Sequence, residues 1–344
     1  MRGACSARAV GFVLGTGLLA PLPVASAYVH TLTPGGCNPV HWAQTCVFVT
    51  SDAAGVPDLP QSDIERIVQS AVGSWQTPAG SYLRLESLQS SESREAGIDG
   101  WQTILFRSKT WCRPADSSGP ALCYDSAANA LTTISYVRDA VDASNDGRIV
   151  DADIELNAVH AVFYDADTQA TPVEPERRPT DLWNTLTHEL GHLQGLDHTC
   201  RGRGDTMPRC ARNGAGDSVA ECTEVEAHRG DDAALAAIHA STMYPSSKAK
   251  ETSKRTPEPD DLAGVVGLYG TENDPAVCTM PGTDLESSDV ASKFSQSPGA
   301  TTVSCNASAL GIPEPGRLWG IALALVGIVR RRHSRSPDRT QTHG

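Results

Sequence analysis

Apolar positions in the first half of the chain follow two periods, one typical of helices and one typical of strands. From Ile64 to Trp75 they recur every three or four residues, which predicts an amphipathic helix. Ser62 and Glu65 stand at the spacing of a capping box at the start of this helix. Short apolar or alternating runs predict strands at residues 46–50, 82–85, 103–106, 131–137 and 149–156.

Two further helices are predicted in the second half. Leucine recurs every third or fourth residue in 182–193, and Thr180 or Asp181 is placed to cap this central helix. Residues 260–270, which begin at a pair of aspartates, resemble the C-terminal helix of a known protein family. The order of elements predicts an α/β fold, in which a twisted mixed sheet carries an N-terminal, a central and a C-terminal helix.

The central helix carries more polar chemistry than packing requires. His188 and His192 stand four residues apart, so they share one helical face and can hold the same metal ion. Glu189 can reach a water on that ion, and Gly195 allows the sharp turn that brings His198 round as a third ligand. The alternative is a core helix with satisfied histidines. Three histidines and a glutamate within eleven residues are too polar for a purely structural face.

Three protein ligands leave a fourth position open for water, as in catalytic zinc sites. The pattern His-Glu-x-x-His-x-x-Gly-x-x-His resembles the metzincin metalloproteases, in which a methionine turn follows. Of two candidate methionines downstream, Met243 with Tyr244 and Pro245 resembles the turn of the matrixin branch more closely than Met207 does. Residues 260–270, which end in Leu-Tyr-Gly, resemble the last helix of matrixin catalytic domains.

This resemblance implies the α+β zincin fold and a zinc-dependent endopeptidase, in which Zn²⁺ activates a water molecule for attack on a peptide bond. It would act on a protein or peptide substrate. Two alternatives stay open: a catalytically inert zinc-containing binding or adhesion protein of the cell surface, and a zinc hydrolase of non-peptide substrates. The implied roles are general base for Glu189, metal ligands for His188, His192 and His198, structural floor for Met243, and substrate contacts for Tyr244 and Pro245.

Two more sites are predicted around the last strand. The matrixin resemblance implies that residues 149–157 lie at the edge of the sheet, where free backbone groups can pair with an extended substrate. Just before this strand, residues 142–147 together with Asp153 space their oxygens like a calcium loop. Asp153 stands where a bidentate glutamate is usual, and strand pairing competes for the same residues. Ca²⁺ is therefore a second candidate ion beside Zn²⁺.

The charge of the chain limits its partners. The formal net charge is −13, and residues 28–312 alone carry 20 basic and 39 acidic side chains. Such a surface repels nucleic acid and anionic membranes, so no nucleic-acid partner is expected. The composition fits a soluble extracellular domain, which we expect to be a monomer.

The N-terminus predicts a secretory signal peptide over residues 1–27. Two arginines, an apolar run and the small residues Ala25-Ser26-Ala27 follow one another in the order of such a signal. A transmembrane anchor is the alternative, but it needs about twenty uninterrupted apolar residues. Pro21 and Pro23 interrupt this run.

A second targeting signal lies near the C-terminus. Ile312-Pro313-Glu314-Pro315 precedes an apolar run at 318–329 and three arginines. This layout resembles bacterial sorting signals of the Pro-Glu-Pro type; a marginal membrane helix that stays in place is the alternative. Either implies an envelope protein that is extracellular or anchored at the cell surface, with transient or C-terminal membrane association. The predicted segments are signal peptide 1–27, catalytic domain 28–270 with a cysteine-bearing insertion 199–240, flexible linker 271–312 and sorting or membrane segment 313–335.

Ten cysteines indicate an oxidising compartment. Cys5 leaves with the signal peptide, so nine remain and one stays without a partner in the chain. A segment around Cys37 faintly resembles a cysteine that caps the zinc, but a disulfide is the simpler interpretation. The expected pairs are Cys37–Cys46, Cys112–Cys123, Cys278–Cys305 and two of Cys200, Cys210 and Cys222.

Overall fold

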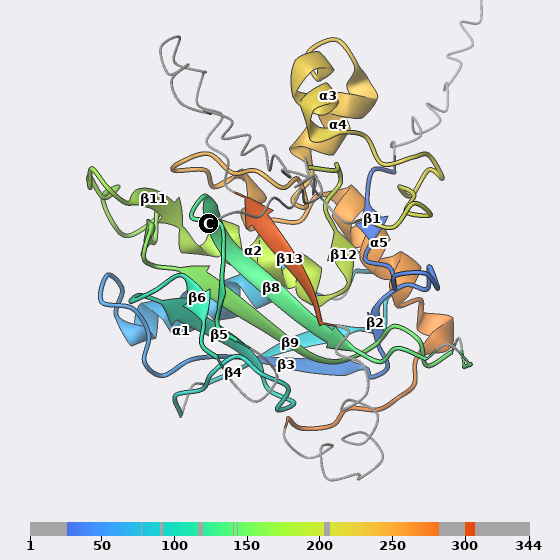
Figure 1. Cartoon of the computed structure of the whole chain (residues 1–344), viewed down its shortest axis with the longest axis horizontal. Coiled ribbons are helices and arrows are strands. Elements are labelled where there is room, and N and C mark those ends of the chain that lie inside the picture. Colours follow the sequence, from blue (N-terminus) through green and yellow to red (C-terminus); the bar gives the residue numbers. More distant parts are fainter. Residues whose placement is uncertain are drawn as a thin grey trace, which may run out of the picture. The chain divides into compact units, whose positions relative to one another are not determined.

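The computed structural model describes residues 26–281, except for residues 77, 90–91, 116–119, 140, 143 and 203–206, together with the backbone of residues 300–306. A mostly parallel central sheet and several helices make up this part of the chain (Figure 1). The strands of the sheet are β2 (His41–Trp42), β3 (Cys46–Ser51), β4 (Arg84–Leu88), β5 (Gln102–Arg107), β8 (Ala128–Tyr136), β9 (Arg148–Asn157) and β13 (Ala300–Asn306).

The strand order in the sheet is β13-β8-β9-β5-β3-β4, and β2 pairs with β9 beyond this path. The pairs β3–β4, β3–β5 and β5–β9 are parallel, whereas β8–β9 and β13–β8 are antiparallel. All five strands predicted from the sequence are therefore present, with ends displaced by up to three residues. The structure confirms the mixed α/β class.

Two helices pack side by side on the sheet, α1 (Gln61–Ser74) and α2 (Leu182–Leu193). Ile64 and Ile67 of α1 and Leu186 of α2 are fully buried, and they join sheet residues such as Ile134 and Ile154 in one core. This single core explains why the apolar stripes of both helices were visible in the sequence. At about 25 cal/mol per Å² of apolar surface removed from water, it is the main stabilising contribution of the fold.

The predicted capping box of α1 is wrong. The helix begins at Gln61 rather than after Ser62, and Pro60 occupies the N-cap position without a side-chain hydrogen bond. Proline fixes φ near its helical value, and it lacks only an N–H that would be unsatisfied at a helix start. The turn before the helix therefore sets its first residue, and Ser62 lies within the first turn.

The predicted position of the strand at 149–157 is also wrong. This strand is β9, and it pairs on one side with β8 and on the other with β5, so it is interior rather than at the edge. Seven of its ten residues, Asp151 to Asn157, form an uninterrupted buried run. Such a run is typical of a strand covered on both faces. Strand β8 pairs antiparallel with β9 and lies between β9 and β13.

The remaining elements surround the sheet and helices. A two-stranded parallel ladder, β10 with β11, leads into α2, and α5 is the predicted C-terminal helix. The insertion forms the helices α3 and α4 between α2 and α5 (Figure 1). These elements are β1 (Val29–His30), β6 (Cys112–Arg113), β7 (Leu122–Cys123), β10 (Ala161–Tyr164), β11 (Arg178–Asp181), β12 (Leu196–Asp197), α3 (Cys222–His228), α4 (Ala233–Ala240), α5 (Pro259–Leu268) and the 3₁₀ turns Ser253–Arg255 and Thr271–Asn273.

Four disulfides link the described residues, and they are consistent with an extracellular or secreted protein. Cys112–Cys123 and Cys200–Cys222 agree with the predictions. The predicted pairs Cys37–Cys46 and Cys278–Cys305 are wrong, because the observed bonds are Cys37–Cys210 and Cys46–Cys278. Their sequence separations of 173 and 232 residues show the reason. Short spacing is a poor guide where the fold brings distant segments together.

The segment expected to be a flexible linker, 271–312, is structured in two places. Cys278 is bonded to Cys46, and Thr45 donates a backbone hydrogen bond to the carbonyl of Val277. Residues 300–306 form β13. Among the described residues, no helix is long and apolar enough to cross a bilayer. The predicted segment 313–335 and all but the last two residues of the predicted signal peptide lie outside the described residues.

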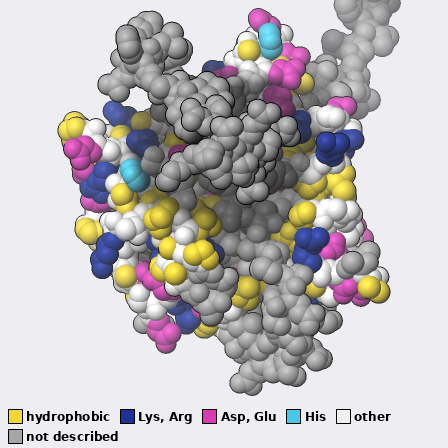
Figure 2. Space-filling view, viewed as in Figure 1, with side chains coloured by type: hydrophobic (Ala, Val, Ile, Leu, Met, Phe, Trp, Pro, Cys, Tyr) yellow, Lys and Arg dark blue, Asp and Glu magenta, His cyan; other side chains and the backbone are white. Residues whose placement is uncertain are grey.

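The surface of the described part is mixed in charge. Figure 2 shows basic and acidic side chains interspersed on one face of the molecule. The large apolar side chains that are exposed are scattered along the chain, in β7 for Leu122 and outside helices and strands for the others: Ile98, Leu122, Val141, Val173, Val277 and Met280.

Candidate metal centre and active site

Helix α2 begins and ends at residues that fix its position. Asp181 is the N-cap, and its carboxylate accepts a hydrogen bond of 2.8 Å from the backbone N–H of Asn184. The sequence had left Thr180 and Asp181 as equal candidates. After the helix, Gly195 adopts φ +93°, and a Cβ there would lie 2.3 Å from the carbonyl oxygen of Val40. Only glycine fits this turn, which carries the chain into β12 and on to His198.

The three predicted histidines come together in the structure. The ring centroids of His188 and His192 lie 4.9 Å apart. The ring centroid of His198 lies 5.5 Å from that of His188 and 4.7 Å from that of His192. All three side chains are buried. Within the described residues, they are the one group of three such side chains close enough to share a metal ion.

Backbone carbonyls orient two of the imidazole rings. Nδ1 of His188 lies 2.5 Å from the carbonyl oxygen of Thr242, and Nδ1 of His192 lies 2.9 Å from that of Leu196. Because a carbonyl oxygen only accepts, Nδ1 donates in both rings and the neutral form keeps its lone pair on Nε2. This is the usual arrangement of a metal-binding histidine, in which the second ring nitrogen is held by the protein.

The electrostatics of the site favour neutral imidazoles. Burial lowers the pKa of His192 to about 4, and it lowers the pKa of His188 and His198 well below the ordinary value. The positive charge of Lys254 lowers the pKa of all three further. The rings are therefore uncharged at neutral pH, as metal ligands must be.

The three nitrogens fit a metal ion. Nε2 of His188 is buried and has no hydrogen-bond partner in the described structure, so a ligand is missing from its surroundings. Nε2 of His192 and Nε2 of His198 lie 3.2 Å apart. Two ligands of a tetrahedral zinc, each at 2.0–2.1 Å, lie about 3.3 Å apart. The buried histidines can thus hold a metal ion; the identity of the ion as zinc stays a prediction.

Glu189 lies beside the histidines and is held by a strand of the sheet. Its side chain is fully buried, and its Oε2 accepts a hydrogen bond of 2.6 Å from the hydroxyl of Thr132 in β8. The sequence predicted the strand but gave no role to Thr132. A threonine in an apolar strand carries no signal of function until the helix that packs on it is placed.

Met243 lies directly against helix α2. It is fully buried, and a Cβ added to Gly191 would lie 2.2 Å from its Sδ. Gly191 stands between the two helical histidines in sequence, so the thioether packs on the backbone that carries them. Its role as a structural floor beneath a metal ion stays a prediction.

Asp261 fixes the turn that contains Met243. One carboxylate oxygen accepts from the hydroxyl of Ser241 at 3.0 Å, and the other accepts from the N–H of Thr242 at 2.9 Å. The N–H of Met243 lies 3.3 Å from the first oxygen. The paired aspartates had been interpreted only as the start of a helix. The second of them also holds the methionine turn beneath the histidines.

A small pocket opens beside the histidines, and we call it the site pocket. His188, Glu189 and Pro245 line it, so the predicted substrate contact of Pro245 is compatible with its position. Tyr244 is placed differently: its hydroxyl donates to Glu226 at 2.8 Å, and its ring packs with the insertion. A role of Tyr244 in substrate binding stays a prediction. The other residues of the site pocket are Asn129, Asn184, Thr185, Ser247 and Lys254.

The polar residues of the site pocket form a connected wall that the sequence did not reveal. Asn184 donates to the hydroxyl of Ser247 at 3.1 Å and accepts from the backbone N–H of Lys254 at 2.8 Å. The ammonium of Lys254 donates to the carbonyls of Tyr244 and Ser246. Asn184 lies one helical turn before His188 in α2, whereas Ser247 and Lys254 are distant from the histidine motif in sequence, and no spacing rule joins these two to it.

The structure does not assemble the predicted calcium loop. Asp153 is buried in β9, where it accepts hydrogen bonds from the backbone N–H groups of Gly97 and Thr103. Asp146 instead accepts from Thr33 and Asn38. The strand therefore takes Asp153 away from the preceding loop, as the competition for the same residues suggested.

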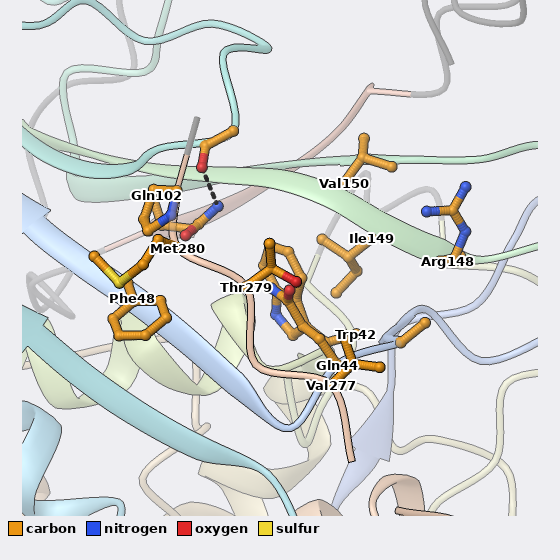
Figure 3. Close-up of a pocket in the computed structure, with 13 residues that line it drawn as sticks. Trp42, Gln44, Phe48, Gln102, Arg148, Ile149, Val150, Val277, Thr279 and Met280 are labelled. Carbon is orange, nitrogen blue, oxygen red and sulfur yellow. Dashed lines mark hydrogen bonds between the residues drawn. The ribbon is translucent and has the colours of Figure 1, made fainter. Parts of the chain in front are cut away.

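A second cavity lies apart from the histidines. It is lined by residues 42–44, by β3, β5 and β9, and by the segment 277–281, which contains Cys278 of the Cys46–Cys278 bond (Figure 3). Figure 3 shows Phe48, Gln102 and Met280 around it. The side-chain amide of Gln102 donates a hydrogen bond of 3.4 Å to the backbone carbonyl of Gly100. Arg148 is the one ionisable side chain of its lining. This cavity therefore lacks the acid–base and ligand groups of the site pocket.

Comparison with known proteins assigns no family to this chain. No protein-family model matches it, and no curated protein matches its sequence. Its function is therefore inferred from its own residues.

Proposed function

We propose that this protein is a zinc-dependent endopeptidase with a matrixin-like catalytic domain of the metzincin type. The observation that carries the proposal is the buried group of His188, His192 and His198, with Glu189 beside it and an open site pocket in front. A structural zinc site is usually closed by four protein ligands, whereas three ligands leave a position for water.

The chain's own residues perform the proton transfers and the positioning. A zinc ion held by the three histidines would supply Lewis-acid activation of water and of the scissile carbonyl. Glu189 accepts the proton of the attacking water and delivers it to the leaving amine. Thr132 holds the Glu189 carboxylate through Oε2, so the base is aligned before substrate arrives. Met243 and Asp261 keep the backbone that carries the ligands rigid.

A peptide substrate suits the surroundings better than a small ester or amide. The site pocket is lined by α2, by Asn129 of β8 and by the segment that follows the methionine turn, and it opens beside His188. Strand β8 borders the same site through Thr132, and its outer edge, where residues 300–306 pair with it, has the backbone groups that an extended chain could bind. Protein or peptide is therefore the proposed substrate, and secretion to the cell envelope is the proposed location.

Peptide-library cleavage, with metal analysis of the same sample, tests this proposal. We expect about one zinc per chain, cleavage of extended peptides, loss of cleavage on treatment with a chelator, and recovery on addition of zinc. A protein that holds zinc but cleaves no library peptide, even with the β13 variant described below, would support the alternative of an inert binding protein. Cleavage that survives removal of all metal would contradict the mechanism.

A further inference from the structure

Strand β13 covers the outer edge of β8. Residues 300–306 pair antiparallel with β8, with Ala300 opposite Ser135 and Val303 opposite Thr132 (Figure 1). The other edge of β8 pairs with β9. Without β13, β8 would therefore be the antiparallel edge strand of the sheet and would present unpaired N–H and C=O groups.

The covered stretch of β8 is the part that borders the candidate active site. Thr132, opposite Val303, holds Glu189 with its hydroxyl. Asn129, near the start of β8, lines the site pocket together with His188 and Glu189. The backbone of β13 therefore runs one strand spacing, about 4.8 Å, from the strand that positions the predicted base.

We infer that the edge of β8 is the docking surface for an extended peptide, and that residues 300–306 of this chain occupy it as an intramolecular competitor that keeps the enzyme latent. This inference rests on the proposed endopeptidase function. Its structural part, the occupation of β8 by the chain's own segment, can be tested without any catalysis.

The sequence of the segment suits this role. Residues 300–306 read Ala-Thr-Thr-Val-Ser-Cys-Asn, which includes three β-branched residues and no charge or proline. β-Branched residues favour extended backbone, and the absence of proline leaves every backbone donor available to a neighbouring strand. A neutral peptide also meets no repulsion from a domain with 39 acidic side chains between residues 28 and 312.

The connection to the domain makes the competition effective. Residues 282–299 join β13 to the segment tied down by Cys278, and 18 residues span at most about 60 Å when fully extended. A tether of this length keeps the segment at an effective concentration on the order of 1 mM. A substrate at micromolar concentration therefore competes poorly until β13 is displaced or removed.

The experiment uses the full chain with proline at two successive positions, Thr302→Pro and Val303→Pro. In a strand only every second N–H faces a given neighbour, so the double variant removes at least one donor to β8. The matched control carries Ser287→Pro and Ser288→Pro, which precede β13 in the chain. The core formed by residues 26–281 is unchanged in both variants.

Amide hydrogen exchange of β8 is the readout that does not depend on activity. We expect about every second amide between residues 131 and 135 to lose at least tenfold protection in the Thr302→Pro/Val303→Pro variant, but not in the control. Addition of a synthetic peptide that spans residues 298–308 should restore the protection. Equal protection in wild type and variant would overturn the inference, whatever the activity.

Kinetics then test latency. With a short fluorogenic peptide, the β13 variant should show a KM about tenfold lower than wild type and an unchanged kcat, and the synthetic peptide should inhibit it competitively. If exchange increases but KM does not change, β13 docks on β8 without blocking the substrate, and the latency is refuted. If exchange increases and no protein cleaves any peptide, the docking stands and the proposed endopeptidase function fails.

Discussion

The hydroxyl of Thr132, in strand β8, donates a hydrogen bond of 2.6 Å to Oε2 of Glu189, in helix α2. The two residues are 57 positions apart in sequence. This contact joins the sheet to the predicted general base. The position of the Glu189 carboxylate therefore depends on how α2 packs against β8. The same strand carries the edge on which β13 lies, so substrate docking and base alignment share one element.

Loss of the Thr132 hydroxyl should lower the rate without affecting the metal. In Thr132→Val the Glu189 carboxylate loses a charge-assisted hydrogen bond worth about 1.5–3 kcal/mol, and we expect kcat to fall about tenfold or more. KM and zinc content should not change, and Thr132→Ser should restore the rate because it keeps the hydroxyl. A valine variant with wild-type kcat would show that Thr132 does not position the base.

Asp261 should matter more to stability than its neighbour Asp260. Each oxygen of Asp261 accepts two hydrogen bonds, and the amide nitrogen of Asp261→Asn would face two donors that it cannot accept. We expect a loss of about 2 kcal/mol or more in the free energy of unfolding, measured by denaturant titration, and weaker zinc binding. The control is Asp260→Asn, whose side chain accepts mainly from the N–H of Ala27. An equal loss in the free energy of unfolding in the two variants would show that Asp261 does not fix the methionine turn.

Gly191 should tolerate no side chain. A Cβ there would lie 2.2 Å from Sδ of Met243 and 3.1 Å from the Trp75 ring. Gly191→Ala should therefore destabilise the protein by about 1–3 kcal/mol, as overpacked cores do, and disturb the zinc site. Gly73→Ala is the matched control, since a Cβ at Gly73 in α1 meets nothing within 4 Å. That variant should stabilise the protein by about 0.5–1 kcal/mol. Thermal unfolding of both variants distinguishes packing from helix propensity.

The buried carboxyls of β9 should make stability depend on pH. Burial raises the pKa of Asp153 to about 8, and burial together with the neighbouring Asp153 raises the pKa of Asp151 well above its ordinary value. The folded state therefore holds protons that the unfolded chain releases near pH 4. The stability associated with these groups is fully present below that pH and is lost as the pH rises towards about 8.

Asp151→Asn tests this dependence. Asparagine is neutral at every pH, and its carbonyl can still accept from the N–H groups of Asp99 and Gly100. Between pH 5 and pH 9 the variant should lose less Tm than wild type does. Asp231→Asn, at an exposed loop position, should follow wild type. If Asp151→Asn and wild type have the same pH profile, the raised pKa values are not those of the folded protein.

Local patterns identified the parts of the structure that depend on neighbours in sequence. The helical spacing of His188 and His192 and the turn at Gly195 follow from residues within one segment. The apolar stripes predicted α1 and α2 because one face of each is buried in the same core. These features could be inferred before any fold was known.

Relations across the fold could not be inferred in this way. The bond Cys46–Cys278 spans 232 residues, and Thr132 and Lys254 reach the site from segments other than α2. The strand at 149–157 was placed at the edge by analogy with its position before the active-site helix. From Asp151 to Asn157 its polar and apolar residues alternate in the sequence, so its burial on both faces became visible only in the structure.

The most direct test of the central claim compares wild type with Glu189→Gln, each loaded with zinc and assayed on the same peptide. Glutamine has the shape of glutamate, and its carbonyl can accept from Thr132, but it cannot take a proton from water. We predict equal zinc content in the two proteins and a rate of peptide cleavage at least 10²-fold lower in the variant. Cleavage by Glu189→Gln at the wild-type rate would contradict the assignment of Glu189 as the base and, with it, the proposed mechanism.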